Sequence, residues 1–373
     1  MIKILHSVSN MDRAGIETMI MNYYRHIDKN KIQFYFLCNK TKPGAYDKEI
    51  KKLGGKIFYS PGLNPLKWFK YQKVVQKIIK DNDIDIVHVH NGALGVQALL
   101  AAKKAGVKVR ISHVHGTRID INLKLPLKLL YKTQLKRLAN QYWGCGLEAI
   151  EYYYGKEIIR KNNYTLLTNA IDENKFKYDE KVRQKIRNEL GIKDNEYLIG
   201  HIGRFMPQKN HDFLIEIFKE IITKNKNYKL LLIGNGELQE NIKNKVKRFD
   251  LTDNVIFTGN ISNVNEMYQA MDLFLLPSLF EGLPVVGIEA QANGLNCLFS
   301  NTISHEVDIT GNVKYLSLKE SPKVWASEAL KISEKTRNKI VNQIKDNNYS
   351  ITTEAKRLEQ KYKELLKCKK EGD

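Results

Sequence analysis

The sequence predicts an α/β protein of two domains, each built on a parallel sheet with helices on both faces. The chain has 373 residues, which is too many for one ordinary core and suits two domains of similar size with a cleft between them. Short β-branched and aromatic runs alternate with amphipathic segments, the pattern of strands joined by helical crossovers. Because this alternation occurs twice, we expect two similar halves.

Each half contains six expected strands, all short, apolar and rich in β-branched or aromatic residues. In the first half we expect strands at residues 2–5, 33–37, 57–59, 86–89, 109–114 and 142–145. In the second half we expect them at residues 198–202, 230–233, 255–257, 273–276, 297–299 and 314–316.

A polar connection separates the two halves. Residues 169–191 are dense in Lys, Asp, Glu and Asn, and we place the domain boundary at Asp172. The first domain is then residues 1–172 and the second is residues 173–350. The segment 351–373 has apolar residues at helical spacing and is otherwise charged, which predicts a closing helix that packs back toward the first domain.

The composition is that of a globular chain with an excess of positive charge. Hydrophobic residues make up 42% and charged residues 27%, which excludes a disordered or fibrous protein. The formal net charge of +20 attracts phosphates, nucleic acid or anionic lipid heads. Because no motif of a nucleic-acid-binding module accompanies this charge, we expect no nucleic-acid partner.

The cysteines and the first residues indicate a compartment. Four widely spaced cysteines form no CxxC pair, which favours a reducing cytosol over a disulfide framework. Asn10, Asp12 and Arg13 interrupt any signal-peptide core, and no apolar run reaches the length of a membrane span. We therefore expect a cytoplasmic protein that contacts the inner face of the cell membrane only peripherally.

The most informative stretch runs from a buried strand into a helix that Pro284 opens. The loop between them carries Glu281, Gly282 and Leu283, and the helix carries Glu289. Free N–H groups at this turn can hold an anion. In the purely structural alternative, Glu281 is a charge favoured by the helix dipole and Glu289 is a solvated helix residue.

A second candidate feature follows the strand at 198–202. This strand delivers Gly203 and Arg204 to its carboxyl end, the edge at which open α/β sheets bind ligands, and Lys209 follows one short loop later. The planar fork of Arg204 and the compact charge of Lys209 suit a diphosphate. In a chain with 61 Lys and Arg residues, the alternative is an ordinary surface pair.

The first half offers a glycine turn and two pairs of histidines. Gly15 stands at a strand-to-helix turn, where glycine lets the backbone approach a ligand or simply permits the turn. His88 and His90, like His113 and His115, are spaced by two, so both members of a pair lie on one face of a strand. Four such histidines could bind zinc, but no acidic or cysteine ligand accompanies them, so we expect no metal. Packing in the core is the structural interpretation of His88 and His113.

A basic segment lies between residues 118 and 137. Lys124, Lys128, Lys132 and Lys136 recur at steps of four among leucines, which predicts one stripe of a helix. A solvated helix face and an interfacial helix on anionic lipid both fit this pattern. We take the four lysines as candidate membrane contacts.

Together, these motifs closely resemble those of family-4 glycosyltransferases, the large retaining group of GT-B fold that builds bacterial capsules, exopolysaccharides and glycolipids. The resemblance spans nearly the whole chain, from residues 15–18 through 168–172 to 280–282. Its most specific part is the pair of glutamates, Glu281 and Glu289, in combination with the two cations after the strand at 198–202.

The resemblance implies a role for each candidate residue. Arg204 and Lys209 would bind the diphosphate of a nucleotide-sugar donor, and Glu289 would hold its ribose. Glu281 would contact hydroxyl groups of the donor sugar, and His115 would lie near the transferred sugar. The catalytic set is then Glu281, His115, Arg204 and Lys209. The donor-binding set is Gly15, Gly203, Arg204, Lys209, Glu281, Gly282, Leu283 and Glu289.

The resemblance also implies an architecture, from which this chain departs at two places. It implies two Rossmann-like domains whose parallel sheets face a central cleft, with the acceptor bound by the first domain and the donor by the second. The usual paired glycine of the first loop is Ala14-Gly15 here, and the usual asparagine-glycine of the junction is Asn169-Ala170. A first loop with less freedom can change the geometry of the acceptor.

The function that follows is retaining transfer of a sugar from a UDP-sugar, or a GDP-sugar, to a polyprenyl-diphosphate-linked glycan in capsule or exopolysaccharide synthesis. Arg204, Lys209 and backbone N–H groups would stabilise the leaving diphosphate, so we expect no cofactor and no metal. Three other interpretations stay open. They are a family-4 enzyme with a phospholipid or protein acceptor, a GT-B nucleotide-sugar epimerase, and a basic nucleic-acid-binding protein.

Overall fold

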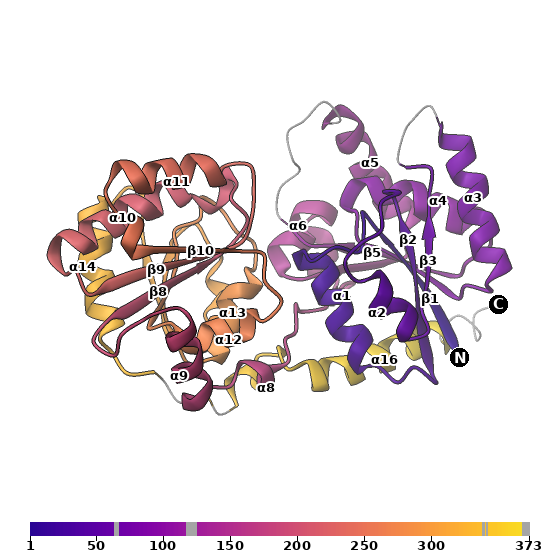
Figure 1. Cartoon of the computed structure of the whole chain (residues 1–373). Coiled ribbons are helices and arrows are strands. Elements are labelled where there is room, and N and C mark those ends of the chain that lie inside the picture. Colours follow the sequence, from indigo (N-terminus) through magenta and orange to yellow (C-terminus); the bar gives the residue numbers. More distant parts are fainter. Residues whose placement is uncertain (63–66, 117–124, 338–339, 341, 368–373) are drawn as a thin grey trace. The chain divides into compact units, whose positions relative to one another are not determined.

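The computed structural model describes all residues except 63–66, 117–124, 338–339, 341 and 368–373. The chain forms two compact units (Figure 1). Unit 1 consists of Met1–Ile171 and Asn348–Asp373, and unit 2 consists of Asp172–Asn347. We expected the second domain to extend to residue 350. Residues 348–350 instead join unit 1, because the backbone N–H of Ile171 donates to Tyr349 O at 2.8 Å.

A seven-stranded parallel sheet forms the centre of unit 1, in the order β3-β2-β1-β4-β5-β6-β7. The six expected strands all form, and β7 is an addition, because a two-residue strand is too short to leave a sequence pattern. The strands are β1 (Ile2–Val8), β2 (Ile32–Cys38), β3 (Lys56–Tyr59), β4 (Ile86–Val89), β5 (Val109–Val114), β6 (Gln141–Gly144) and β7 (Thr165–Leu166).

Helices cover both faces of this sheet, because successive strand residues such as Ile4 and Leu5 point to opposite sides. On the Ile4 side the core contains residues of α1, α2 and α16, and on the Leu5 side it contains residues of α3 to α6. The helices are α1 (Gly15–His26), α2 (Asp47–Lys52), α3 (Trp68–Asp81), α4 (Val96–Lys104), α5 (Leu125–Leu138), α6 (Leu147–Tyr154), α7 (Lys156–Arg160) and α16 (Ile351–Lys367), with η2 (Gly92–Gly95) as a 3-10 turn.

The helix α16 is an integral part of the unit 1 core. Ala355, Leu358 and Tyr362 recur along one helical face and are buried against the sheet. The ring of Tyr362 stacks on Trp143 of β6, with 5.6 Å between the ring centroids. The closing helix expected from the sequence therefore packs on the first sheet.

A six-stranded parallel sheet forms the centre of unit 2, in the order β10-β9-β8-β11-β12-β13. All six expected strands form, each within two residues of the expected ends. The strands are β8 (Tyr197–Ile202), β9 (Tyr228–Ile233), β10 (Val255–Gly259), β11 (Leu273–Leu276), β12 (Asn296–Ser300) and β13 (Val313–Leu316).

Helices and 3-10 turns complete unit 2. Leu214 and Phe218 of α10 and Trp325 of α14 pack with Leu230 of β9 and Leu273 of β11 in one apolar cluster. The helices are α8 (Glu173–Phe176), α9 (Glu180–Glu189), α10 (His211–Lys224), α11 (Gln239–Arg248), α12 (Val264–Ala270), α13 (Val285–Ala292), α14 (Pro322–Ser333) and α15 (Gln343–Asp346); the 3-10 turns are η3 (Pro207–Lys209), η4 (Thr252–Asn254) and η5 (His305–Val307).

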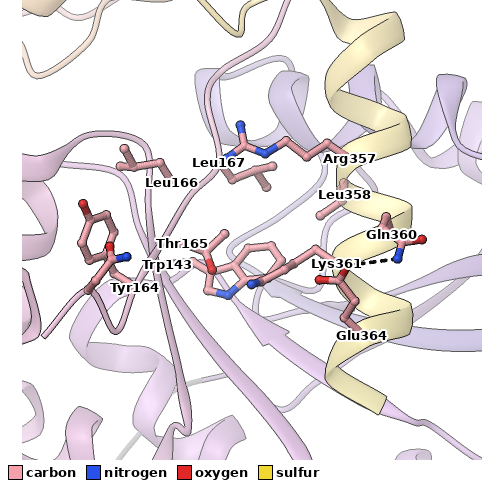
Figure 2. Close-up of a pocket in the computed structure, with 11 residues that line it drawn as sticks. Trp143, Tyr164, Thr165, Leu166, Leu167, Arg357, Leu358, Gln360, Lys361 and Glu364 are labelled. Atoms are coloured by element: carbon pink, nitrogen blue, oxygen red, sulfur yellow. Dashed lines mark hydrogen bonds between the residues drawn. The ribbon is translucent and has the colours of Figure 1, made fainter. Parts of the chain in front are cut away.

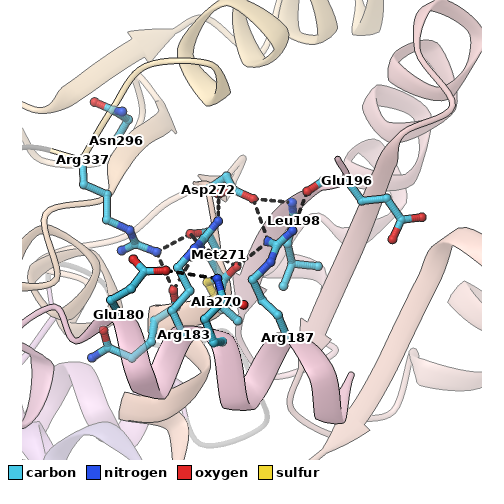
Figure 3. A network of polar contacts seen from close by, with 12 residues as sticks. Glu180, Arg183, Arg187, Glu196, Leu198, Ala270, Met271, Asp272, Asn296 and Arg337 are labelled. Atoms are coloured by element: carbon cyan, nitrogen blue, oxygen red, sulfur yellow. Dashed lines mark hydrogen bonds and ion pairs between the residues drawn. The ribbon is translucent and has the colours of Figure 1, made fainter. Parts of the chain in front are cut away.

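An arginine network fixes the amino end of β11. Figure 3 shows Arg183 and Arg187 meeting Asp272, while Arg337 points to the carbonyl groups at the end of α12. Arg183 Nη2 lies 2.6 Å from Asp272 Oδ1, and Arg187 Nη1 lies 3.3 Å from Oδ2. The backbone N–H of Leu198 in β8 donates to Oδ2 at 2.7 Å. Asp272 thus ties α9, β8 and β11 together.

A pocket of about 490 Å³ lies beside α16 in unit 1. Figure 2 shows Arg357, Lys361 and Glu364 of α16 on one side and Thr165 and Trp143 on the other. None of the candidate site residues lines this pocket. The pocket therefore does not coincide with the candidate site, which we locate from the chemistry of the candidate side chains.

Candidate active site

Two loops at the carboxyl edge of the unit 2 sheet form the candidate site. They follow β8 and β11, which are neighbouring strands. The backbone N–H of Leu279 donates to Gln208 O at 2.8 Å, and Asn210 Nδ2 donates to Pro277 O at 3.1 Å. These two hydrogen bonds join the loops, so residues far apart in the sequence meet at one edge of the sheet.

Lys209 and Glu281 form an ion pair in these loops. Lys209 Nζ lies 2.5 Å from Glu281 Oε1, and the two side chains are only 15% and 10% exposed. Gln208 Nε2 donates to the other carboxylate oxygen, Oε2, at 3.1 Å. Both oxygens of Glu281 therefore have a donor, and charge-assisted contacts of this kind fix the carboxylate firmly.

Glycine at position 203 makes room for the lysine of this pair. A Cβ atom on Gly203 would lie 3.0 Å from Cδ of Lys209, which is tighter than ordinary contact. Gly234 approaches from the next strand, with a φ of +137°, and a Cβ there would lie 2.2 Å from Gly203 O. The Lys209 side chain thus lies against bare backbone at the end of β8.

Arg204 is exposed at the same edge. Within the described residues, its guanidinium has no hydrogen-bond or ion-pair partner. Its five N–H donors are therefore available to a ligand. The structure places Arg204 one residue after Gly203 in the loop that also carries Lys209, so the two cations share one loop.

Glu289 is half-buried in α13 and hydrogen-bonded to Tyr268 of α12. Tyr268 Oη donates to Glu289 Oε2 at 2.9 Å. Burial raises the pKa of Glu289 to about 7, and the Tyr268 hydrogen bond opposes this shift because it stabilises the carboxylate. The other oxygen, Oε1, has no partner within the described chain and can accept from a ligand.

The turn before α13 differs from expectation by one residue. We expected Pro284 to be the first helical residue, whereas the helix begins at Val285 and Pro284 is its N-terminal cap. Proline has no backbone N–H, so no hydrogen-bond donor is left unpaired when Pro284 occupies the cap position. Gly282 and Leu283 precede it and are half-buried, and a Cβ on Gly282 would meet no atom within 4 Å.

The remaining site candidates, Gly15 and His115, belong to unit 1. Gly15 begins α1, and a Cβ there would meet no atom within 4 Å, so packing does not require glycine at this position. His115 follows β5 and is half-buried. Burial lowers its pKa to about 3, so the imidazole is neutral at physiological pH.

The histidines of unit 1 form a larger cluster than the sequence indicated. His88 and His113 are fully buried, as core packing requires, and His88 Nε2 lies 3.2 Å from His113 Nδ1. His90 Nδ1 lies 3.0 Å from His115 Nε2. His6 of β1 was missed: its Nδ1 lies 2.9 Å from His90 Nε2.

The predicted lysine stripe of α5 is wrong at Lys128, which is only 8% exposed. Lys128 lies on the buried face with Tyr131 and Leu135, because a step of four residues turns about 40° beyond a full helical turn. The Nζ of Lys132 lies 3.7 Å from the Tyr152 ring centroid. Lys136 is exposed, and Lys124 lies outside the described residues.

Another face of α5 is open to solvent. Its exposed residues are Pro126, Leu129, Leu130, Thr133, Lys136 and Arg137, with Leu129 and Leu130 49% and 56% exposed. These positions follow helical spacing and combine apolar side chains with two cations. The described part of the chain has no helix that is both long enough and apolar enough to cross a membrane.

Two family models account for most of the chain. The model "Glycosyl transferases group 1" matches residues 182–350, and the model "Glycosyltransferase Family 4" matches residues 13–145. The chain belongs to this family of glycosyltransferases and is therefore an enzyme of the hexosyltransferase class. This confirms the family to which the sequence motifs pointed.

The names of related proteins describe glycosyltransferases, and one of them is named for capsular polysaccharide biosynthesis. EpsF of Bacillus subtilis (strain 168), classed as a glycosyltransferase, is 36% identical over 87% of this chain and 86% of its own length. The UDP-Gal:alpha-D-GlcNAc-diphosphoundecaprenol alpha-1,3-galactosyltransferase of Escherichia coli is 28% identical over 80% of this chain and 79% of its own. The capsular polysaccharide biosynthesis glycosyltransferase CapH of Staphylococcus aureus is 25% identical over 95% of this chain and 97% of its own length.

Solved structures show the same fold at low sequence identity. A glycosyltransferase from Rickettsia africae has a TM-score of 0.75 and 18% identity, covering 98% of this chain and 99% of that one. The structure of Anabaena Alr3699/HepE in complex with UDP and glucose has a TM-score of 0.73 and 17% identity, and the match covers 97% of this chain and 95% of that one. The fold is thus GT-B, with two Rossmann-like units, as predicted.

Proposed function

We propose that this enzyme transfers a sugar from a UDP-sugar to a polyprenyl-diphosphate-linked glycan, with retention of the anomeric configuration. The observation that carries the proposal is the group of Arg204, Lys209, Glu281 and Glu289 in unit 2. Two cations suit a diphosphate, and two carboxylates suit hydroxyl groups, so the set matches the parts of a nucleotide sugar. The name of the Escherichia coli relative, which states a UDP-galactose donor and a diphosphoundecaprenol acceptor, supports this assignment.

The cations stabilise the leaving group. In the reaction, the bond between the sugar and the diphosphate breaks while the acceptor oxygen bonds to the same face of the sugar. The acceptor proton passes to the departing diphosphate. Arg204, Lys209 and the backbone N–H groups near the start of α13 contact oxygens whose negative charge grows as the bond breaks. This stabilisation needs no divalent metal.

The carboxylates and His115 position the donor. The unpaired Oε1 of Glu289 accepts hydrogen bonds from the ribose, and Glu281 accepts them from the transferred sugar. His115 is neutral because it is buried, so it contacts the sugar as a hydrogen-bonding group and not as a cation. Gly15 lies beside the donor phosphates or the acceptor.

Because the proposed acceptor is linked to a membrane lipid, we assign the enzyme to the inner face of the cell membrane. We expect no nucleic acid as a partner. We assign peripheral contact to the exposed face of α5, where Leu129 and Leu130 enter the lipid interface and Lys136 and Arg137 meet anionic head groups. This face replaces the stripe of four lysines, since Lys128 is buried.

A reconstituted transfer assay tests the proposal. Purified protein is incubated with a panel of UDP- and GDP-sugars and a short polyprenyl-diphosphate-linked glycan, with a chelator present, and products are followed by mass spectrometry and NMR. We expect one UDP-sugar to give a product with the anomeric configuration of the donor. Inversion, or transfer only to phospholipid or protein, contradicts the proposal. Conversion of the nucleotide sugar without any acceptor indicates an epimerase instead.

A further inference from the structure

The pocket beside α16 takes no part in the proposed transfer. Its volume of about 490 Å³ is that of a small-molecule site, since ligand pockets in proteins span roughly 300–1,000 Å³. All the residues that line it belong to unit 1. One wall is α16, and the other is the segment 162–167, which contains β7. We propose that this pocket binds a small organic phosphate, such as a sugar phosphate, through Arg357 and Lys361.

Two cations stand on the helical wall of the pocket. Arg357 and Lys361 are four positions apart, so they lie on one face of α16 and repel each other. Figure 2 shows both side chains directed from α16 toward the opposite wall. That wall, residues 162–167, contains no acidic residue. An anion between the two walls would therefore relieve the repulsion between the cations.

The acidic side chains near the cations do not neutralise both of them. Glu354 Oε2 lies 3.3 Å from Arg357 Nη1, and Glu364 Oε1 accepts a hydrogen bond of 2.9 Å from Gln360 Nε2. Within the described chain, the ammonium group of Lys361 has no hydrogen-bond or ion-pair partner. A guanidinium fork beside a compact ammonium group suits the oxygens of a phosphate.

Trp143 adds a hydrogen-bond donor at the floor of the pocket. Its indole is fully buried and stacks on Tyr362, with 5.6 Å between the ring centroids. The Nε1–H group is buried and has no acceptor among the residues that the structure describes, which is costly. Figure 2 shows Lys361 directed toward this indole. An oxygen of a ligand held by Lys361 would supply the missing acceptor.

The rest of the lining suits an organic group attached to the phosphate. Leu166 and Leu358 supply apolar surface, while the hydroxyl of Thr165 and the amides of Asn162 and Gln360 supply hydrogen bonds. Apolar surface with a few polar groups is typical of small-molecule sites, and the hydroxyl and amides match the hydroxyl groups of a sugar. A bare phosphate ion would fill only a small part of this volume.

The pocket adjoins both segments through which the chain leaves and re-enters unit 1. The strand wall ends at Leu167 and the chain continues to Ile171, while α16 begins at Ile351. The backbone N–H of Ile351 donates to Ile171 O at 2.9 Å, so the two segments are already joined there. A ligand that bridges α16 and β7 would hold the closing helix more firmly on unit 1.

Binding of glucose 6-phosphate to the full-length protein tests the proposal, with saturating UDP present to occupy the donor site. We expect one site per chain by calorimetry, and a melting temperature that rises with ligand concentration. Lys361→Gln and Arg357→Gln should each weaken binding at least tenfold, because each removes a charge-assisted contact. Lys361→Arg keeps the charge and should largely retain binding. Lys356→Gln changes an exposed lysine of α16 outside the pocket and should bind normally.

Four results would overturn the assignment. They are the absence of saturable binding, binding unchanged in Lys361→Gln, inorganic phosphate that binds as tightly as glucose 6-phosphate, and binding only to vesicles of phosphatidic acid. The third would indicate an adventitious ion only, and the fourth a lipid head group. Circular dichroism of each variant checks that it folds. The pocket uses no residue of unit 2, so this test and the transfer assay can fail separately.

Discussion

Lys209 Nζ lies 2.5 Å from Glu281 Oε1, so the carboxylate assigned to the donor sugar holds one of the two cations assigned to the donor diphosphate. Both side chains are largely buried. In the described structure neither Lys209 nor Glu281 forms a second ion pair, and the other donor to Glu281 is the neutral amide of Gln208. A diphosphate arriving at Lys209 therefore competes with Glu281 for the same ammonium group.

Glu281→Gln should separate sugar positioning from nucleotide binding. The amide keeps the shape of the side chain but removes the charge that competes for Lys209. We expect single-turnover transfer to fall at least tenfold, while UDP affinity, measured by calorimetry, stays the same or rises. Loss of UDP affinity together with transfer would show that Glu281 acts mainly by holding Lys209 in place.

Replacing either cation should slow transfer. Each charge-assisted contact contributes about 1.5–3 kcal/mol, which corresponds to roughly tenfold to a few hundredfold in rate. We therefore expect losses of this size in Lys209→Ala and Arg204→Ala, measured with a chelator present. Lys247→Ala and Arg248→Ala are matched controls on the exposed face of α11 and should transfer normally. Near-normal rates in both site variants contradict the diphosphate assignment.

Glu289 should make stability depend on pH. Burial raises the pKa of Glu289 from the ordinary 4.5 to about 7. As the pH rises, the Glu289 carboxyl therefore ionises at a lower pH in the unfolded chain than in the folded protein. Its contribution to stability is complete below about pH 4.5 and is lost as the pH rises through about 7. Relative to Glu289→Gln, the native protein should lose about 1–3 kcal/mol of unfolding free energy across this window, after allowance for partial exposure.

Tyr268→Phe provides the control for this titration. It removes the hydrogen bond that stabilises the Glu289 carboxylate, so the pH window should move upward. Urea unfolding at a series of pH values measures both effects. A pH dependence identical in the native protein and Glu289→Gln would assign the titration to another group.

Asp272→Ala should destabilise unit 2. The substitution leaves Arg187, whose side chain is 4% exposed, without its carboxylate partner, and breaking a buried pair in this way costs about 3–5 kcal/mol. Hydrogen exchange should increase in β8 and β11, and the urea midpoint should fall. Asp253→Ala changes an exposed aspartate of η4 and should leave both measurements unchanged.

The exposed face of α5 should govern binding to anionic vesicles. Leu129→Ser with Leu130→Ser removes apolar side chains, and Lys136→Gln with Arg137→Gln removes about 1 kcal/mol of lipid attraction per charge. Both pairs should weaken co-sedimentation with vesicles. Lys132→Gln changes a lysine held over the Tyr152 ring and should have little effect. Equal effects of all three would disprove a single contact face.

Strands could be predicted from the sequence because each is a short buried run, but contacts between strands could not. Lys209 and Glu281 lie 72 positions apart and meet only because β8 and β11 are neighbours in the sheet. The same limit hid His6, which pairs in register with His88 across β1 and β4. Lys128 was misplaced because its spacing suggested a stripe, whereas its burial depends on which helical face meets the core.

The position of α16 in the chain affects how the protein folds during synthesis. Leu358 and Tyr362 complete the core of unit 1, yet the ribosome makes them only after all of unit 2. Unit 2 is one continuous segment and can fold as soon as it emerges, whereas unit 1, which is made first, still lacks α16 over part of one sheet face. A nascent chain that stalls before Ile351 would thus present the apolar rings of Phe34 and Trp143 to chaperones.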